Sequence, residues 1–206
     1  MPRQSLDIIE INCRDADDLY LQGFFRESAR EYCRVLARSP EHARAAENLA
    51  VVLSQLGLGR KAFPWARIAE VLNPANERCN FLIGKISLDL KRFSVATHSF
   101  CKTVCLAPDR SSHWRWTANS LLSENDTLTA NQHAERAALL DSEDSEGILI
   151  LALTRFAKGD RISSKLLLLD LTNRNPLVAE YQYQLDRQYI TVDLKELNIY
   201  TEFLMY

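Results

Sequence analysis

Three residues of metal-binding type fall on one short stretch of the sequence. His98, Cys101 and Cys105 are separated by three and four positions, which puts their side chains on one face of a helix. Imidazole and thiolate are common zinc ligands, but a structural zinc site needs four ligands and the paired helix supplies no fourth. We interpret the three residues as a surface histidine and ordinary thiols, and we predict no metal site.

Signatures of catalysis are missing from the sequence. It has no phosphate-binding glycine loop, no Ser-His-Asp order and no nucleophile elbow. Acidic residues gather in pairs such as Asp17 and Asp18, and in residues 141–146, where carboxylates stabilise helix N-termini through the dipole. The alternative for the acidic residues 124–146 is a basic partner surface, which salt-dependent binding would test. We predict no catalytic residue and no cofactor.

Composition narrows the class of protein. The chain has 206 residues, a net charge of −2 and 47% hydrophobic residues, values typical of a soluble protein and unlike the basic patch of a nucleic-acid binder. No apolar run approaches the roughly 18 residues of a membrane span, and the N-terminus lacks an export signal. The odd number of cysteines, five, lacks disulfide-framework spacing. We expect a cytoplasmic protein with reduced thiols, no membrane insertion and no nucleic-acid partner.

A single period runs through most of the chain. Pro40, Pro74 and Pro108 are 34 residues apart, and the same step leads to Ser142 and then to Pro176. Each position follows an apolar-periodic segment, where proline stops a helix. Small residues recur in the same phase, which lets paired helices approach closely; they are Ala50, Gly84, Ala118 and Ala152, and then Ala62, Ala96, Ala130 and Ser164.

These motifs resemble the tetratricopeptide repeat, a 34-residue helix–turn–helix unit. The resemblance covers roughly residues 9–176 as five repeats, at 9–42, 43–76, 77–110, 111–144 and 145–178. The second repeat matches best, and the first is degenerate because Asp15 stands where leucine is expected. Its first helix is therefore expected to start late or to serve as a cap. The resemblance implies an all-α fold, a right-handed superhelical solenoid of antiparallel helix pairs.

Stacked repeats form a concave groove lined by the first helix of each pair. By register this lining includes Asp17 and Tyr20 in repeat one, and Glu47 and Val51 in repeat two. It is polar in repeat two and strongly apolar in repeats three to five. We predict a peptide-binding groove in which Phe81, Trp116 and Phe156 are aromatic anchors. Its predicted residues are Asn48, Arg78, Phe81, Leu82, Lys85, Leu88, Arg115, Trp116, Asn119, Leu122, Leu149, Leu153 and Phe156.

The segment at residues 177–206 offers another explanation for this apolar lining. It is rich in tyrosine and leucine and ends in an unusually apolar stretch. We expect a C-terminal capping helix on the last repeat, followed by a tail that covers the groove in cis or docks on a second copy as a homodimer. An exposed apolar stripe needs some such cover.

One subtype of the family is rejected on its residues. Chaperone-binding tetratricopeptide domains hold a peptide's C-terminal carboxylates with lysine, asparagine and arginine at five positions. Here these positions carry Cys13, Asp17, Asn48, Arg78 and Leu82, and Asp17 would repel a carboxylate.

The leading hypothesis is a scaffold or adaptor that binds a segment of another protein, in a narrower version a chaperone that shields an apolar client segment. The alternatives are a non-catalytic accessory that presents substrate to a separate transferase, and a self-association module.

Overall fold

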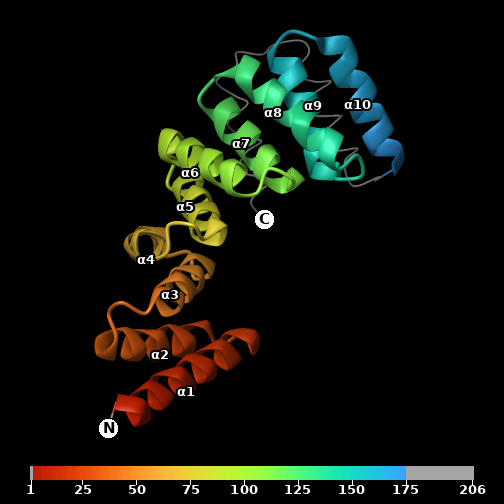
Figure 1. Cartoon of the computed structure of the whole chain (residues 1–206). Helices are drawn as coiled ribbons and strands as arrows, with labels where there is room; N and C mark the ends of the chain where they lie inside the picture. The colour runs from red at the N-terminus through yellow and green to blue at the C-terminus, as the bar shows by residue number, and fades with distance from the viewer. Residues whose placement is uncertain (1, 175–206) are drawn as a thin grey trace. The chain divides into compact units, whose positions relative to one another are not determined.

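The structure, a computed structural model, describes residues 2–174, and their side chains from residue 10 onward. In this part of the chain every regular element is an α-helix (Figure 1). The helices are α1 (Pro2–Leu21), α2 (Phe25–Arg38), α3 (Ala43–Gln55), α4 (Gly59–Leu72), α5 (Glu77–Asp89), α6 (Phe93–Leu106), α7 (Ser111–Ser123), α8 (Thr127–Leu140), α9 (Ser145–Ala157) and α10 (Arg161–Arg174). The predicted all-α class is confirmed.

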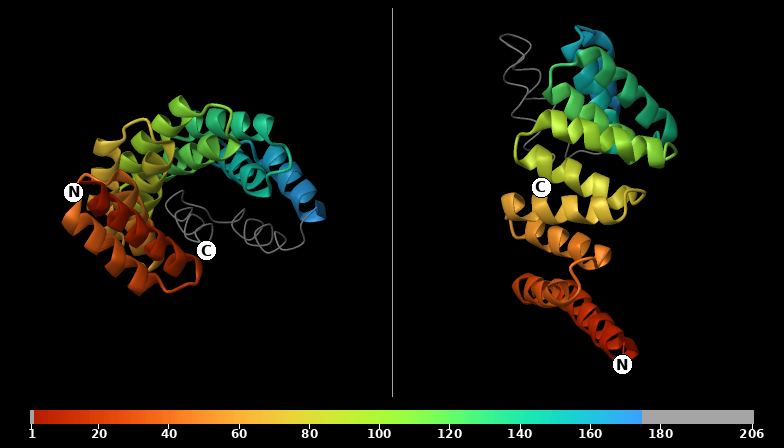
Figure 2. Two further views of the ribbon diagram at one scale, coloured as in Figure 1. Left: turned by 60° about the horizontal axis from the view of Figure 1, so that its bottom comes forward. Right: turned by 60° about the vertical axis from the view of Figure 1, so that its left-hand side comes forward.

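The chain divides into two compact units, Met1–Leu106 and Ala107–Tyr206. Unit 1 contains α1 to α6 and unit 2 contains α7 to α10. Within each unit consecutive helices pack as antiparallel pairs, and each second helix also packs on the first helix of the next pair (Figure 2). The first helices of neighbouring pairs also touch, α3 with α5 and α7 with α9.

The turn inside each pair has the same backbone conformation. Positive φ values between 57° and 94° occur at Gly23, Gly57, Lys91, Asn125 and Gly159, each 34 residues after the one before. In every turn the following residue donates its N–H to the carbonyl five positions earlier, at 2.7–3.0 Å. This is the Schellman arrangement, which satisfies helix-end carbonyls and requires a left-handed residue. Glycine suits this position because it has no Cβ.

The connections between pairs hold the prolines that set the period. They fall between Arg38 and Ala43, Leu72 and Glu77, and Leu106 and Ser111. Side chains then cap the next helix, since Asn76 accepts from the N–H of Arg78 and Asp144 accepts from that of Glu146.

The first helix departs from the prediction. The alternative that it starts late is wrong, because α1 is 20 residues long and begins at Pro2. Proline is well tolerated as the first helical residue, and no breaker follows it until Gly23. Helices α3, α5, α7 and α9 begin at Ala43, Glu77, Ser111 and Ser145, and we propose that each pair is one repeat. The predicted capping helix and tail lie outside the described residues.

Small and large residues complement each other where the helices of a pair cross. In unit 1 a Cβ added to Gly84 on α5 would lie 2.5 Å from Cε1 of Phe100 on α6, so the large ring occupies the space that the glycine leaves. In unit 2 the position equivalent to Phe100 is Ala134, opposite Ala118, and both are fully buried. The two residues at this crossing therefore have a smaller combined volume in unit 2 than in unit 1, and the large ring of unit 1 fits only because its neighbour is glycine.

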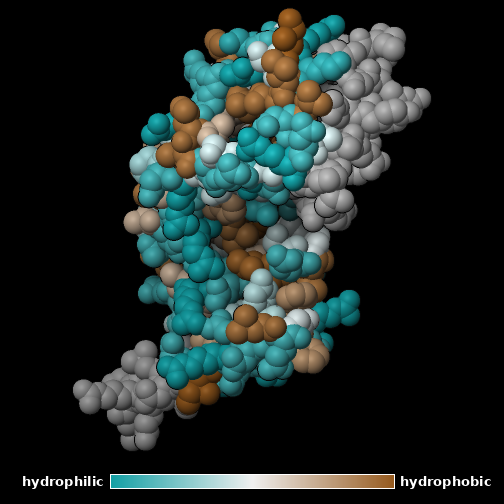
Figure 3. Space-filling model, turned by 90° about the vertical axis from the view of Figure 1, so that its right-hand side faces the viewer, coloured by the Kyte–Doolittle hydropathy of each residue, from teal (hydrophilic) through white to brown (hydrophobic). Residues whose placement is uncertain are grey.

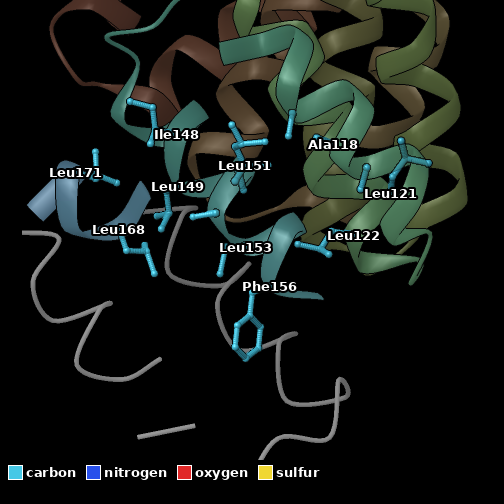
Figure 4. Close-up of a cluster of buried hydrophobic side chains, with 14 residues drawn as sticks. Ala118, Leu121, Leu122, Ile148, Leu149, Leu151, Leu153, Phe156, Leu168 and Leu171 are labelled. Atoms are coloured by element: carbon cyan, nitrogen blue, oxygen red, sulfur yellow. The ribbon is translucent and has the colours of Figure 1, made fainter. Parts of the chain in front are cut away.

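Unit 2 buries the more apolar core. Its cluster brings together side chains from four helices, including Leu121, Ile148, Leu151, Leu168 and Leu171 (Figure 4). Nine of the 13 residues of α9 are buried. The outer surface carries single exposed hydrophobic residues such as Leu139 and Val71, and Figure 3 shows hydrophobic and hydrophilic side chains mixed over the face that it presents. In the described residues no helix is long and apolar enough to cross a membrane.

Candidate functional site

A cleft of about 510 Å³ opens in unit 1 between the first helices of its three pairs. Its polar floor and apolar edge come from α1, α3 and α5, with one residue from α2. The lining residues are Asp17, Tyr20, Leu21, Tyr32, Arg44, Glu47, Asn48, Val51, Val52 and Arg78.

Asp17 is at the centre of a hydrogen-bond network on the cleft floor. Its Oδ1 accepts from the Tyr32 hydroxyl and, at 3.0 Å, from Nδ2 of Asn48. Its Oδ2 accepts from Arg44. Both carboxylate oxygens thus accept hydrogen bonds, and the charge of Asp17 is balanced by Arg44. The repulsion of a ligand carboxylate that the sequence predicted is therefore reduced.

Two arginines stand on the rim in the same register of consecutive pairs. Arg44 pairs with Asp17 and lies 3.5 Å from Glu10, while Nε of Arg78 lies 3.3 Å from Oε1 of Glu47. Their side chains remain 53% and 74% exposed. Each guanidinium has five N–H donors, so both keep donors for a ligand beyond the ones used here.

Burial favours the protonated form of one tyrosine and two cysteines near the cleft floor. The pKa of Tyr32 is raised, first by burial and then by its hydrogen bond to Asp17. Burial, and then the charge of Glu47, raises the pKa of Cys79 to about 12. Burial and Asp17 likewise raise the pKa of Cys13. A raised pKa leaves each thiol protonated near neutral pH, so neither Cys13 nor Cys79 is an activated nucleophile.

Asn48 supplies the polar group best placed to meet a polypeptide. Its Nδ2 is used by Asp17 and, at 3.2 Å, by the Tyr32 hydroxyl. Among the described residues its Oδ1 has no hydrogen-bond donor, and the side chain is partly exposed. An amide oxygen held in this way accepts a backbone N–H, while the arginines donate to carbonyl or carboxylate oxygens. Val51, Tyr20 and Leu21 provide apolar contact beside them.

The predicted groove residues divide between the units. Of the six in unit 1, only Asn48 and Arg78 line the cleft. Phe81 packs on Phe100 with ring centroids 5.6 Å apart, Leu82 and Lys85 are partly buried, and Leu88 is buried.

The seven in unit 2 are held in place by packing and ion pairs. Trp116, Asn119, Leu122, Leu149, Leu153 and Phe156 are each at most 9% exposed. Arg115 lies 3.0 Å from Asp144, also pairs with Glu146, and stands over the Trp116 ring. Their part in ligand binding stays a prediction.

Four residues that line the cleft were not predicted from the sequence, namely Leu21, Tyr32, Arg44 and Val52. Arg44 has a visible signal, since it precedes Arg78 by one period of 34. Tyr32 has none, because it belongs to a second helix and reaches the cleft only through its hydroxyl. The candidate zinc residues lie on α6, with His98 and Cys105 exposed and Cys101 partly buried. No group of three potential metal ligands is assembled within the described residues.

The sequence matches no protein-family model and no curated protein. Solved structures resemble the fold closely. MamA from Desulfovibrio magneticus superposes with a TM-score of 0.76 at 14% identity, over 80% of this chain and 93% of that one. YrrB, a TPR protein described with an unusual peptide-binding site, gives 0.75 at 14% identity over 84% and 90%. A tetratricopeptide repeat protein from Parabacteroides merdae gives 0.81 at 12% identity over 96% and 79%. This chain has the fold of the tetratricopeptide-repeat proteins.

Proposed function

We propose that this protein is a non-catalytic interaction scaffold that binds an extended segment of another protein in the cleft of unit 1. The observation that carries the proposal is the amide oxygen of Asn48, which accepts no hydrogen bond from the described residues and shares the cleft with two exposed arginines, Arg44 and Arg78. A peptide backbone offers the N–H that Asn48 accepts and the carbonyls to which the guanidinium groups donate. The peptide-binding site named for YrrB, a protein of the same fold, adds support.

The cleft favours a scaffold over an enzyme. Its two carboxylates, Asp17 and Glu47, are engaged with arginines, and burial raises the pKa of the thiols nearest to them, Cys13 and Cys79. General acid–base or nucleophilic catalysis needs a group with a pKa near the working pH and access to substrate. Recognition needs only the donors, acceptors and apolar edge that the cleft provides.

The narrower versions of this function stay predictions. A chaperone-like role and a cytoplasmic location are compatible with a peptide-binding scaffold. Self-association through residues 177–206 falls outside the described residues, and service to a separate transferase would require a partner of that class.

The test is selection of linear peptides from a displayed library on the intact protein, followed by titration of the selected peptides. Asn48→Ala and Arg78→Gln should each weaken binding about 5- to 50-fold, the range of one or two lost hydrogen bonds to a charged or amide group. Val71→Ser on α4 is the control, since Val71 is 72% exposed and outside the cleft. Equal affinity of all three variants would refute the proposal, provided that circular dichroism shows unchanged helicity.

A further inference from the structure

A second concave surface lies on the opposite helices of unit 1. It is a groove of about 800 Å³ between α2 and α4, with α3 beneath it. Leu49 and Leu53 of α3 and Trp65 of α4 form an apolar floor. This groove shares no residue with the cleft around Asn48.

The rim of this groove is basic. Arg30 and Arg34 of α2 and Arg60 and Lys61 of α4 stand around the apolar floor, and no carboxylate is among the described residues that line it. Arg34 is paired with Glu31. No ion pair among the described side chains engages Arg30, Arg60 or Lys61, and all three are exposed. Three cationic side chains without an ion-pair partner among the described residues therefore border this apolar groove.

This combination is specific to one place in the repeat array. One period later, the positions of Arg30 and Arg34 are occupied by Pro64 and Ile68. The positions of Arg60, Lys61 and Trp65 are then occupied by Ser94, Val95 and Ser99. The helix pairing is the same at both places, so the fold alone does not require the basic rim or the tryptophan.

The charge of the whole unit acts in the same direction. Residues 1–106 contain 15 basic and 12 acidic residues, whereas residues 107–206 contain 10 basic and 15 acidic ones. Unit 1 is therefore net positive, and its field adds to that of the rim in attracting an anionic partner. Exposed apolar surface surrounded by charge is the composition of an interaction site.

We propose that the α2–α4 groove binds an acidic amphipathic helix of a partner protein. The partner's leucine-type side chains pack on Trp65, Leu53 and Ile68, while its glutamates and aspartates pair with Arg30, Arg60 and Lys61. This is recognition of a helix in a groove, in which apolar anchors supply affinity and charges supply specificity and rate of association. The site adds a second partner surface to the cleft and does not depend on it.

The probe is a fluorescein-labelled amphipathic peptide of about 16 residues, roughly four helical turns, with leucines on one face and glutamates on the other. A matched peptide carries lysine in place of glutamate. Fluorescence anisotropy with the full chain should show binding of the acidic peptide only, and weakening with added salt. Arg30→Glu/Arg60→Glu should weaken that binding about tenfold, equal to about 1.4 kcal/mol, and should gain affinity for the lysine peptide.

The matched control is Arg14→Glu/Arg26→Glu, which changes the net charge equally at two exposed positions outside the groove. The chain also contains its own footprinting pair, because Cys33 lines the groove and Cys105 is exposed elsewhere. The acidic peptide should slow maleimide labelling of Cys33 and leave Cys105 unchanged. An equal loss of binding in the control variant, an unprotected Cys33, or equal affinity for both peptides would overturn the proposal. A homodimer that dissociates only in Arg30→Glu/Arg60→Glu would overturn it in favour of a second copy as the occupant.

Discussion

Asn48 and Ile150 occupy the same register position three periods apart, one in each unit. Around Asn48 the first helices enclose a polar cleft, and six of the 13 residues of α3 are buried. Around Ile150, nine of the 13 residues of α9 are buried in an apolar cluster. The helices are the same length and pair in the same way. The side chains on this face therefore decide whether it lines an open polar cleft or forms part of an apolar core.

The charged positions show the same division. Arg44 and Arg78 are equivalent by register, and the corresponding residue of α9 is Glu146. In unit 1 the position presents exposed guanidinium groups to the cleft, whereas in unit 2 an acidic side chain there pairs with Arg115. The helix geometry thus stays the same from one unit to the other, while the sign of the charge at this position changes.

The largest expected effect tests whether the inner face of unit 2 is core. Leu153→Ala should destabilise the protein by about 2–5 kcal/mol, because Leu153 is 3% exposed and its removal leaves a cavity. Val51→Ala, at the same register position in unit 1, should cost less than about 1.5 kcal/mol since Val51 is only partly buried at the cleft. Urea unfolding measures both. An equal loss of unfolding free energy in the two variants would show that this face is buried to the same extent in both units.

The next effect concerns how volume is shared within a pair. Gly84→Ala should destabilise unit 1 by about 1–3 kcal/mol through the clash with Phe100, although alanine is the better helix former. The Phe100→Leu change should restore part of this loss in the double variant, a coupling that a double-mutant cycle measures. Ala118→Gly in unit 2 should cost about 1 kcal/mol from helix propensity, and it should show no coupling to Phe100→Leu.

Alkaline pH should destabilise unit 1 before unit 2. The pKa of Cys79 is raised from 9.0 to about 12 by burial and by Glu47. The neutral thiol therefore stabilises the fold fully below about pH 9, and this contribution is lost as the pH rises toward 12. Tyr32 acts in the same direction. Hydrogen exchange by helix should show loss of protection, on the order of 1 kcal/mol per pH unit above pH 9, in α1 to α6.

All five cysteines lie in unit 1, which explains this expected asymmetry. Cys79→Ala is the control variant for the alkaline experiment and should flatten the pH dependence of unit 1. A slope unchanged in Cys79→Ala would assign the effect to other groups.

The smallest effect compares two turns. Lys91 in unit 1 has φ of 57° and Asn125 in unit 2 has φ of 63°, a conformation that costs lysine more than asparagine. Lys91→Gly should raise stability by about 0.5–1 kcal/mol and Asn125→Gly by less. Thermal unfolding monitored by circular dichroism measures both changes. A larger gain at Asn125 would contradict the ranking.

Much of the fold was predictable from particular residues. Pro40, Pro74 and Pro108 marked where second helices end, because proline acts through the local backbone. The late start of α1 was wrong, since one unsuitable residue, Asp15, does not end a helix that continues on both sides. The phase of the repeat predicts on which face of its helix a residue lies. It does not predict which side chains that residue contacts.

The sequence by itself determined the period of 34 and the helix pairs, because helix formation and helix ends depend on neighbours within a few positions along the chain. Only the tertiary structure decided that the Asp17 carboxylate is neutralised by Arg44, that Tyr32 reaches the cleft from a second helix, and that Phe100 fills the space above Gly84. These outcomes depend on side chains 15 to 27 residues apart in sequence, whose distance is set by how the helices pack.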